Sequence, residues 1–152
     1  MPDAPAKPLQ LQVATKAVIE NEDGAVLLLQ RSKPYHGQTV LTWDIPGGRI
    51  DSGESLEQAL RRELKEETDL ELESVGPVLH VKDFIIETES IHVVRITFKA
   101  TVKGEIKLSH EHTDYRWVPK AELPLEPTAI HFIEALQANG WIRDYNKQHQ
   151  AL

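Results

Sequence analysis

The chain has 152 residues, of which 40% are hydrophobic and 27% are charged, and its formal net charge is −7 at pH 7. These values are those of a single folded domain and argue against a disordered or fibrous protein. The absence of cysteine excludes disulfides, thiolate nucleophiles and cysteine-bound zinc. The acidic balance argues against binding to a nucleic-acid polymer, and an anionic ligand such as a phosphate would need a cation between itself and the protein.

The distribution of apolar residues predicts a cytoplasmic protein that does not cross a membrane. The first eleven residues include three prolines and no apolar run suited to a signal peptide, and no later segment is long enough to span a bilayer. We divide the chain into a flexible N-terminal tail at 1–10, a single domain at 11–142 and a loose, polar C-terminal tail at 143–152.

The first half of the domain begins with two predicted strands, at 13–19 and 25–30, joined by a turn at 21–24 as in a β-hairpin. A polar loop with Pro34, His36 and Gly37 follows and ends near Trp43. Ser55 is suited to cap a helix, with Gln58 completing a capping box, and helix-forming residues continue to position 67.

The second half contains further strands and a second helix. Residues 91–102 alternate between apolar and polar in the manner of a half-buried strand, and 78–81 and 84–86 are its expected partner strands. Residues 115–118 form a short predicted strand. A second helix is expected to open at Pro127 and to end before Gly140. The predicted architecture is α/β (α+β), with a mixed β-sheet covered by helices.

Three acids of the first helix lie on or beside its apolar face. At 100° per residue, Glu63, Glu66 and Glu67 fall near the sector that holds the apolar side chains, namely Leu56, Ala59, Leu60 and Leu64. A solvated acidic turn, as in a plain acidic interaction domain, is the simplest alternative. Two half-buried carboxylates about 5.5 Å apart repel by roughly 3 kcal/mol at an effective dielectric constant of 20, so such a group must protonate or bind cations.

The residue types around these acids favour a hard cation. Arg62 can pair with only one acid across a turn, which leaves the others without a counter-ion. Carboxylate ligands without a histidine at helical spacing favour Mg²⁺ or Mn²⁺ over zinc. Just before the helix, Gly47 and Gly48 allow close approach of the backbone, and the carbonyl of Gly48 can serve as a further oxygen ligand, although a plain turn would use the same residues.

The spacing of these residues is Gly48, five residues, Glu54, seven residues, and then the run Arg62-Glu63-Leu64-Lys65-Glu66-Glu67-Thr68-Asp69-Leu70. This pattern closely resembles the Nudix box of the Nudix hydrolase family. The one departure is Asp69, where the family usually has glycine just beyond the helix. Aspartate tolerates the left-handed backbone conformation better than most residues. The resemblance implies a Nudix-type α/β/α sandwich for the domain at 11–142.

The resemblance also implies roles for the residues of the box. Glu63, Glu66 and Glu67 would hold Mg²⁺ or Mn²⁺ with the carbonyl of Gly48, and Glu54 and Arg62 would brace the loop and the helix. The acid that activates water would be Glu63 or Glu66 of the box, or else Glu111 or Asp114 in a later segment.

Three other side chains have both a structural and a functional interpretation. Arg31 could contact a substrate phosphate, although an exposed arginine is the simpler interpretation. His110 and His112 flank Glu111 but are more typical of a surface strand or loop than of a zinc site. Trp43 is expected to pack in the core rather than to stack on a base.

The function that follows from the resemblance is metal-dependent hydrolysis of the pyrophosphate linkage in a nucleoside diphosphate joined to another group. The alternative is a non-catalytic Nudix-like module that binds a nucleotide as a sensor. The expected partner is a small nucleotide substrate, with no nucleic-acid polymer and no membrane, and a homodimer is left open.

Overall fold

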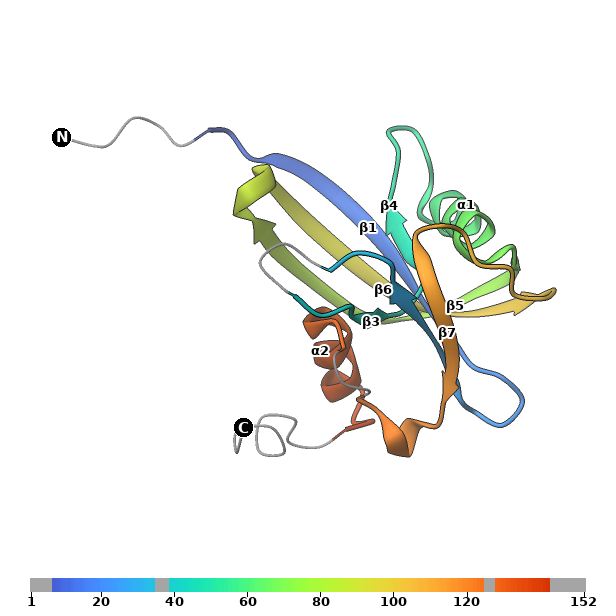
Figure 1. Cartoon of the computed structure of the whole chain (residues 1–152). Coiled ribbons are helices and arrows are strands. Elements are labelled where there is room, and N and C mark those ends of the chain that lie inside the picture. Colours follow the sequence, from blue (N-terminus) through green and yellow to red (C-terminus); the bar gives the residue numbers. More distant parts are fainter. Residues whose placement is uncertain (1–6, 35–38, 125–127, 143–152) are drawn as a thin grey trace, which may run out of the picture.

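The computed structural model describes residues 7–34, 39–124 and 128–142, which form two β-sheets with two α-helices packed against them (Figure 1). One sheet has the strand order β4-β1-β6-β5, with β4 (Gly47–Arg49), β1 (Gln10–Ile19), β6 (Ile91–Lys103) and β5 (Glu71–Ile86). The other has the order β3-β2-β7, with β3 (Trp43–Asp44), β2 (Val26–Arg31) and β7 (His112–Val118). The helices are α1 (Leu56–Thr68) and α2 (Ile130–Ala138), and the short 3-10 helices are η1 (Glu87–Glu89) and η2 (Lys120–Glu122).

The four-stranded sheet is mixed, as expected. β1 runs parallel to β6, with Gln10 opposite Ile91 at one end and Ile19 opposite Ala100 at the other, whereas the pairs β1–β4 and β5–β6 are antiparallel. β5 is one strand of 16 residues where two short strands were predicted. Lys82 and Asp83, which separate the two predicted strands, pair with Arg95 and Val94 of β6 without a register shift, and the register shifts of β5 lie nearer its start.

The predicted hairpin is wrong, although its strands and its turn are present. β1 and β2 belong to different sheets. Beside the turn, Glu20 and Val26 form an isolated antiparallel bridge. The side-chain oxygen of Asn21 accepts the amide of Ala25 at 2.9 Å, and Gly24 adopts a φ of +77°. This turn therefore carries the chain from one sheet to the other instead of closing a ladder.

The two helices lie on different sides of β2 (Figure 1), and a cluster of buried apolar side chains lies under each of them. Leu27 and Leu29 of β2 pack with Leu60 and Leu64 of α1. The alternate β2 residues pack on the other side with residues of α2, in a cluster that includes Val26, Leu28, Trp43, Phe132, Ile133 and Leu136. Because both faces of β2 are buried, this strand separates the two cores. Each helix packs against one of its faces.

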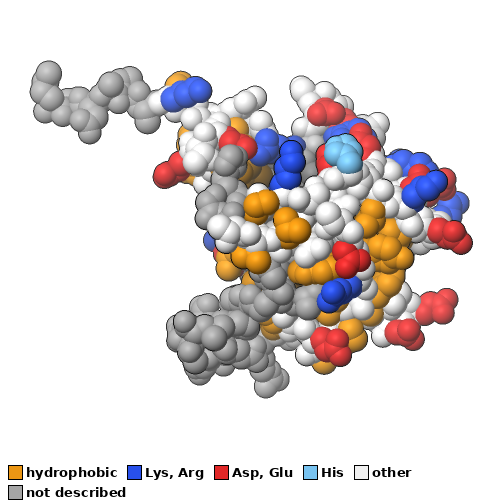
Figure 2. Space-filling model, viewed as in Figure 1, with side chains coloured by type: hydrophobic (Ala, Val, Ile, Leu, Met, Phe, Trp, Pro, Cys, Tyr) orange, Lys and Arg blue, Asp and Glu red, His pale blue; other side chains and the backbone are white. Residues whose placement is uncertain are grey.

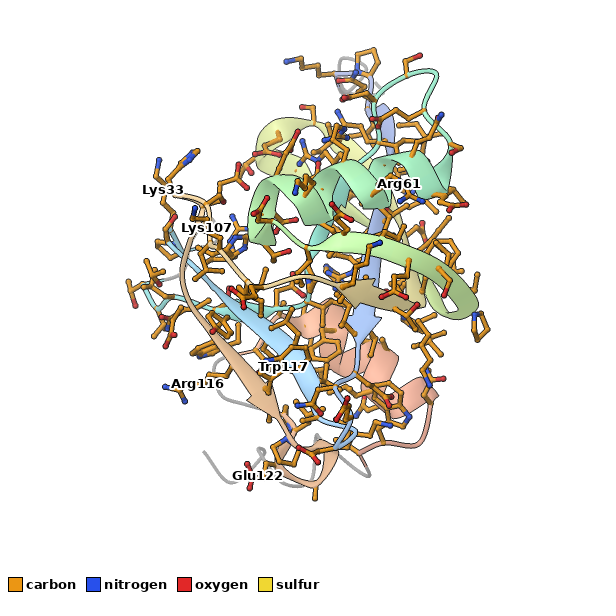
Figure 3. All side chains as sticks on the ribbon, turned by 90° about the vertical axis from the view of Figure 1, so that its right-hand side faces the viewer. Lys33, Arg61, Lys107, Arg116, Trp117 and Glu122 are labelled. Carbon is orange, nitrogen blue, oxygen red and sulfur yellow. The ribbon has the colours of Figure 1, made fainter. Side chains whose placement is uncertain are left out.

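Successive side chains of β7 also point to opposite faces of their sheet. In Figure 3, Arg116 and Trp117 of this strand point to opposite sides. Trp117 packs against the core under α1, whereas the guanidinium of Arg116 lies 4.8 Å from the ring centre of Trp43. Trp43 itself is 4% exposed and belongs to the core under α2, as predicted.

Local signals set the helix ends. Ser55 and Gln58 form the predicted capping box at the start of α1. α2 begins at Ile130, and Pro127, at which its start was predicted, lies outside the described residues, as do His36, Gly37, positions 1–6 of the N-terminal tail and the whole tail at 143–152. In the part of the chain that the structure describes, no helix is long and apolar enough to cross a membrane.

Candidate active site

The candidate site is built where β4, the C-terminal half of α1 and the start of β7 meet. Gly47 opens β4 with a φ of +135°, and a Cβ on it would collide with the backbone oxygen of Thr15 in β1. The ammonium of Lys16 donates to the carbonyl oxygens of Ile45 and Gly47 at 3.2 and 3.3 Å. Glycine is therefore required at position 47 for β4 to lie this close to β1.

Glu67 is the most buried acid of α1, with only 4% of its side chain exposed. Its Oε1 accepts the amide of Gly47 at 2.9 Å, which joins the helix to β4. Burial raises the pKa of Glu67 to about 8. The charge of Lys16 and the Gly47 amide oppose this shift, and the acids Glu63 and Glu111 add to it. Without a bound cation the carboxyl group is therefore mainly protonated at pH 7.

Glu63 lies directly against Gly48. A Cβ on Gly48 would stand 2.6 Å from the carboxyl carbon of Glu63, so the absence of a side chain makes room for this carboxylate. The Glu63 side chain is 16% exposed. Burial raises its pKa, whereas the hydrogen bond and the charge of Arg62 oppose the rise. The position of Glu63 beside the apolar face thus agrees with the helical-wheel prediction.

Arg62 joins α1 to the loop before it. Its Nε and Nη2 donate to the two carboxylate oxygens of Glu54 at 2.7 and 3.0 Å, and Nη2 also donates to the carbonyl of Arg49 at 3.1 Å. Its Nη1 donates to Glu63 at 2.8 Å and contacts Glu66 at 3.4 Å. The Arg62 guanidinium lowers the pKa of Glu54 to about 2, with help from the amide of Asp51. These contacts tie α1 to the loop that holds Glu54 and to the backbone of β4.

Glu66 differs from the other two acids of the group because 59% of its side chain is exposed. Its recorded contact is the long one to Arg62. The helical wheel placed it only on the flank of the apolar face, and the structure agrees with that placement. Glu66 is thus free of the burial that acts on Glu67.

The segment after β6 brings a further acid to α1. The amides of Lys107 and Ser109 donate to the carbonyls of Thr68 and Glu67 at 2.8 and 3.1 Å. This segment therefore lies alongside the C-terminal end of α1. It thereby places the carboxylate of Glu111 next to that of Glu67. Asp114, the other predicted acid of this region, is 52% exposed, and its recorded contacts are with its neighbours Tyr115 and Arg116.

His112 was expected to be a surface strand or loop residue, but its side chain is buried beside Glu67. Its side chain is 9% exposed, and its Nε2 lies 3.4 Å from Oε2 of Glu67. Burial lowers the pKa of His112 to about 4, and the charges of Lys16 and Arg31 act in the same direction. The ring is therefore neutral at pH 7. No local pattern distinguished His112 from His110, because burial here depends on how β7 packs against α1.

Arg31 and a second buried charge group lie near the site. Arg31 is opposite His112 in the β2–β7 ladder, and its charge acts on the imidazole of His112. Asp44 is held between Arg95 at 3.1 Å and Lys16 at 3.4 Å. Burial alone would raise the pKa of Asp44, but the two cations hold it well below its usual range. This group was also missed, because its members come from three separate strands.

The donor set fits a divalent cation. One oxygen each of Glu67 and Glu111 and one ring nitrogen of His112 all lie within 4.8 Å of one another. The carboxylate of Glu63 lies against the backbone of Gly48 in β4. Charged side chains of both signs gather over β4 and α1 on the face seen in Figure 2. Several acids share this region with few cations, and a bound divalent ion would supply the missing positive charge.

Comparison with known proteins gives a consistent set of relatives. Residues 10–136 match the NUDIX domain family. A nucleoside triphosphatase NudI from Escherichia coli is 33% identical over 118 residues, which cover 70% of this chain and 80% of the relative. A MutT protein structure from Methanosarcina mazei Go1 has a TM-score of 0.75 and 30% identity, covering 87% of this chain and 94% of that one. A MutT NUDIX hydrolase structure from Burkholderia pseudomallei has a TM-score of 0.73 and 29% identity, with 85% and 98% covered.

Proposed function

Because the chain belongs to the Nudix hydrolase family, we propose that it hydrolyses the pyrophosphate linkage of a nucleoside diphosphate joined to another group, in a reaction that depends on Mg²⁺ or Mn²⁺. Nucleoside triphosphates are the first substrates to test, since the curated relatives are named nucleoside triphosphatases. The observation that carries the proposal is the burial of Glu67 beside Gly47, with Glu63 and Glu111 close enough to raise its pKa.

Glu63, Glu66 and Glu67, with the carbonyl of Gly48, are the proposed ligands of the cation. When bound, the cation supplies positive charge that binds and polarises the phosphate oxygens. Glu67 is fixed by the Gly47 amide, and Glu63 by Arg62, so these two carboxylates are held in place before substrate arrives. Glu66 is exposed and has the freedom to turn toward substrate or solvent.

The proton of the attacking water is taken by a carboxylate of this group, and Glu63, Glu66 and Glu111 are the proposed acceptors. Glu63 and Glu66 lie in the C-terminal half of α1, and Glu111 lies in the segment between β6 and β7. The water oxygen then bonds to one phosphorus of the pyrophosphate linkage, the bond from this phosphorus to the bridging oxygen breaks, and the bridging oxygen leaves on the other phosphate. Arg31, opposite His112 in the ladder, is the proposed contact for a phosphate that faces β2.

A nucleotide panel with Mg²⁺ tests the function directly. We expect turnover of at least one nucleoside triphosphate or diphosphate derivative, with the products identified by phosphorus NMR. Glu63→Gln should reduce the rate by about a hundredfold or more, equivalent to about 2.7 kcal/mol of barrier. Glu57→Gln is the matched control, because Glu57 lies in the same helix but pairs with Arg61 on the exposed face.

The same panel separates the rival functions. A sensor module would bind a nucleotide tightly and release no phosphate product. A plain acidic interaction domain would neither bind nor hydrolyse any member of the panel. Either result, obtained with folded protein and millimolar Mg²⁺, would contradict the proposal.

A further inference from the structure

His112 is a buried polar side chain whose hydrogen-bonding capacity the protein does not use. Its Nδ1 is buried and has no hydrogen-bond partner among the described residues. Its Nε2 is 3.4 Å from Oε2 of Glu67, which is longer than an ordinary N–H···O hydrogen bond. Buried polar atoms in folded proteins are nearly always paired, so an unpaired imidazole that borders a group of acids requires an explanation.

The neighbours of His112 are donors that a metal ion can use. A ring nitrogen of His112 and carboxylate oxygens of Glu67 and Glu111 lie within 4.8 Å of one another. Donor atoms bound to one ion at about 2.1 Å are about 3.0 Å apart when they are adjacent and about 4.2 Å apart when they are opposite. Nε2 of His112 and Oε2 of Glu67, at 3.4 Å, are already near the adjacent spacing, and a pair as wide as 4.8 Å would have to shorten by at least about half an ångström to share the ion.

The backbone holds these three donors from different directions. Glu67 is fixed from α1 by the amide of Gly47. The carbonyl of Glu111 accepts the amide of Ser32 at 2.9 Å, which ties its segment to the end of β2. His112 is opposite Arg31 in the same pair of strands. The donor atoms are thus placed by the sheet and the helix together, and a small rotation of side chains is sufficient to close the group around an ion.

We propose that His112 is a nitrogen ligand of a divalent ion that Glu67 and Glu111 also bind, and that this mixed site favours Mn²⁺ over Mg²⁺. The inference rests on the proposed function, since the ion is one that serves the hydrolase reaction. Imidazole nitrogen suits transition metals, whereas Mg²⁺ prefers oxygen ligands and retains its water. With Glu111 engaged as a ligand, Glu63 and Glu66 remain as acceptors of the proton from water.

The experiment is pulsed electron paramagnetic resonance of Mn²⁺ bound to the full chain. Coordinated imidazole gives a modulation from its ¹⁴N nucleus, and we expect this signal in the parent protein. His112→Gln should lose the signal and bind Mn²⁺ about tenfold more weakly, while its affinity for Mg²⁺ changes less than threefold. His110→Gln is the matched control, because His110 is exposed and only two residues away, and it should keep both the signal and the affinity.

A second measurement does not depend on a substitution. Parent protein with ¹⁵N-labelled histidine should replace the ¹⁴N modulation with that of ¹⁵N, which identifies the ligand as a histidine even if His112→Gln fails to fold. Mn²⁺ bound without any imidazole signal in the parent would overturn the inference and would leave only an outer hydrogen bond from His112 to Glu67. If nucleotide hydrolysis with Mg²⁺ proceeds in that case, the proposed function stands alone. Absence of both Mn²⁺ binding and hydrolysis would overturn both.

Discussion

At the scale of single residues, Glu67 is where burial and charge conflict most. Its side chain is 4% exposed, and its pKa rises from 4.5 to about 8. Because the folded state holds this proton more tightly than the unfolded state, the associated stability is fully present below pH 4.5 and is lost as the pH rises through 8. The metal-free protein should therefore become less stable toward alkaline pH.

Glu67→Gln removes this conflict and should change stability and activity in opposite directions. In the presence of a chelator, the variant should be more stable than the parent at pH 9 by a few kcal/mol, and the two should be nearly equal at pH 4.5. Urea unfolding at the two pH values measures the difference. With Mg²⁺ the variant should lose about a hundredfold or more of the hydrolysis rate. A variant that unfolds at a lower urea concentration than the parent at pH 9 would show that ionised Glu67 does not destabilise the fold.

Asp69 is the residue that departs from the Nudix pattern, and the structure shows how it replaces glycine. It ends α1 in the left-handed conformation at a φ of 61°, and its carboxylate is 2.8 Å from the ammonium of Lys65. Asp69→Gly would relieve the backbone and remove this surface pair, two small effects of opposite sign. We expect a melting temperature within about 3 °C of the parent and kcat/KM within about threefold. A tenfold loss of kcat/KM would place Asp69 in the active site.

At the scale of elements, the position of α1 relative to the preceding loop depends on Arg62. Its guanidinium bonds both oxygens of Glu54 and one of Glu63, a geometry that an ammonium cannot reproduce. Arg62→Lys should therefore lower stability by about 1 to 2 kcal/mol and lower kcat by about tenfold. Arg61→Lys is the control on the exposed side of α1, and it should have a much smaller effect on kcat. Equal kcat losses in the two variants would rule out a specific role for the Arg62 bonds.

The approach of β4 to α1 depends on Gly48. The Cβ of Gly48→Ala would lie 2.6 Å from the carboxyl carbon of Glu63, so this carboxylate must move. We expect at least a tenfold loss of kcat/KM, measured beside Gly24→Ala. Gly24 has a φ of +77°, and a Cβ on it would meet no atom within 4 Å, so its substitution strains the backbone away from the site. Comparable rate losses in both variants would point to general destabilisation instead of a displaced Glu63.

The elements that sequence predicted well are those with local determinants. α1 follows from its capping box and its helical periodicity, and β6 from the alternation of apolar and polar residues over 94–102, although Arg95 and Thr97 are buried as well. The hairpin of β1 and β2 was predicted wrongly because a turn signal does not specify which strands pair. His112 escaped prediction for the same reason, since its contact with Glu67 joins residues 45 positions apart that only the packing of β7 against α1 brings together.

At the scale of the whole molecule, the candidate site lies where elements of both sheets meet α1. β2 has both faces buried and separates the two cores, and α1 packs against one of these faces. β4, at the edge of the larger sheet, then meets the C-terminal half of α1, and the segment before β7 meets it from the smaller sheet. The acids at this junction come from α1 and from the segment before β7, and β4 contributes backbone groups, so a bound ion would link these elements.

That linkage predicts that divalent ions stabilise the whole fold. An ion that binds only the folded state adds RT ln(1 + [L]/Kd), about 2.7 kcal/mol at one hundred times Kd. The melting temperature should accordingly rise by about 5 to 10 °C with Mg²⁺ or Mn²⁺. Replacing Glu63, Glu66 and Glu67 together by glutamine should raise the metal-free melting temperature and abolish the response to metal. Glu57→Gln and Glu73→Gln, two exposed acids outside the group, should leave the response intact. A parent melting curve that millimolar Mg²⁺ and Mn²⁺ do not move would mean that the acids form no cation site.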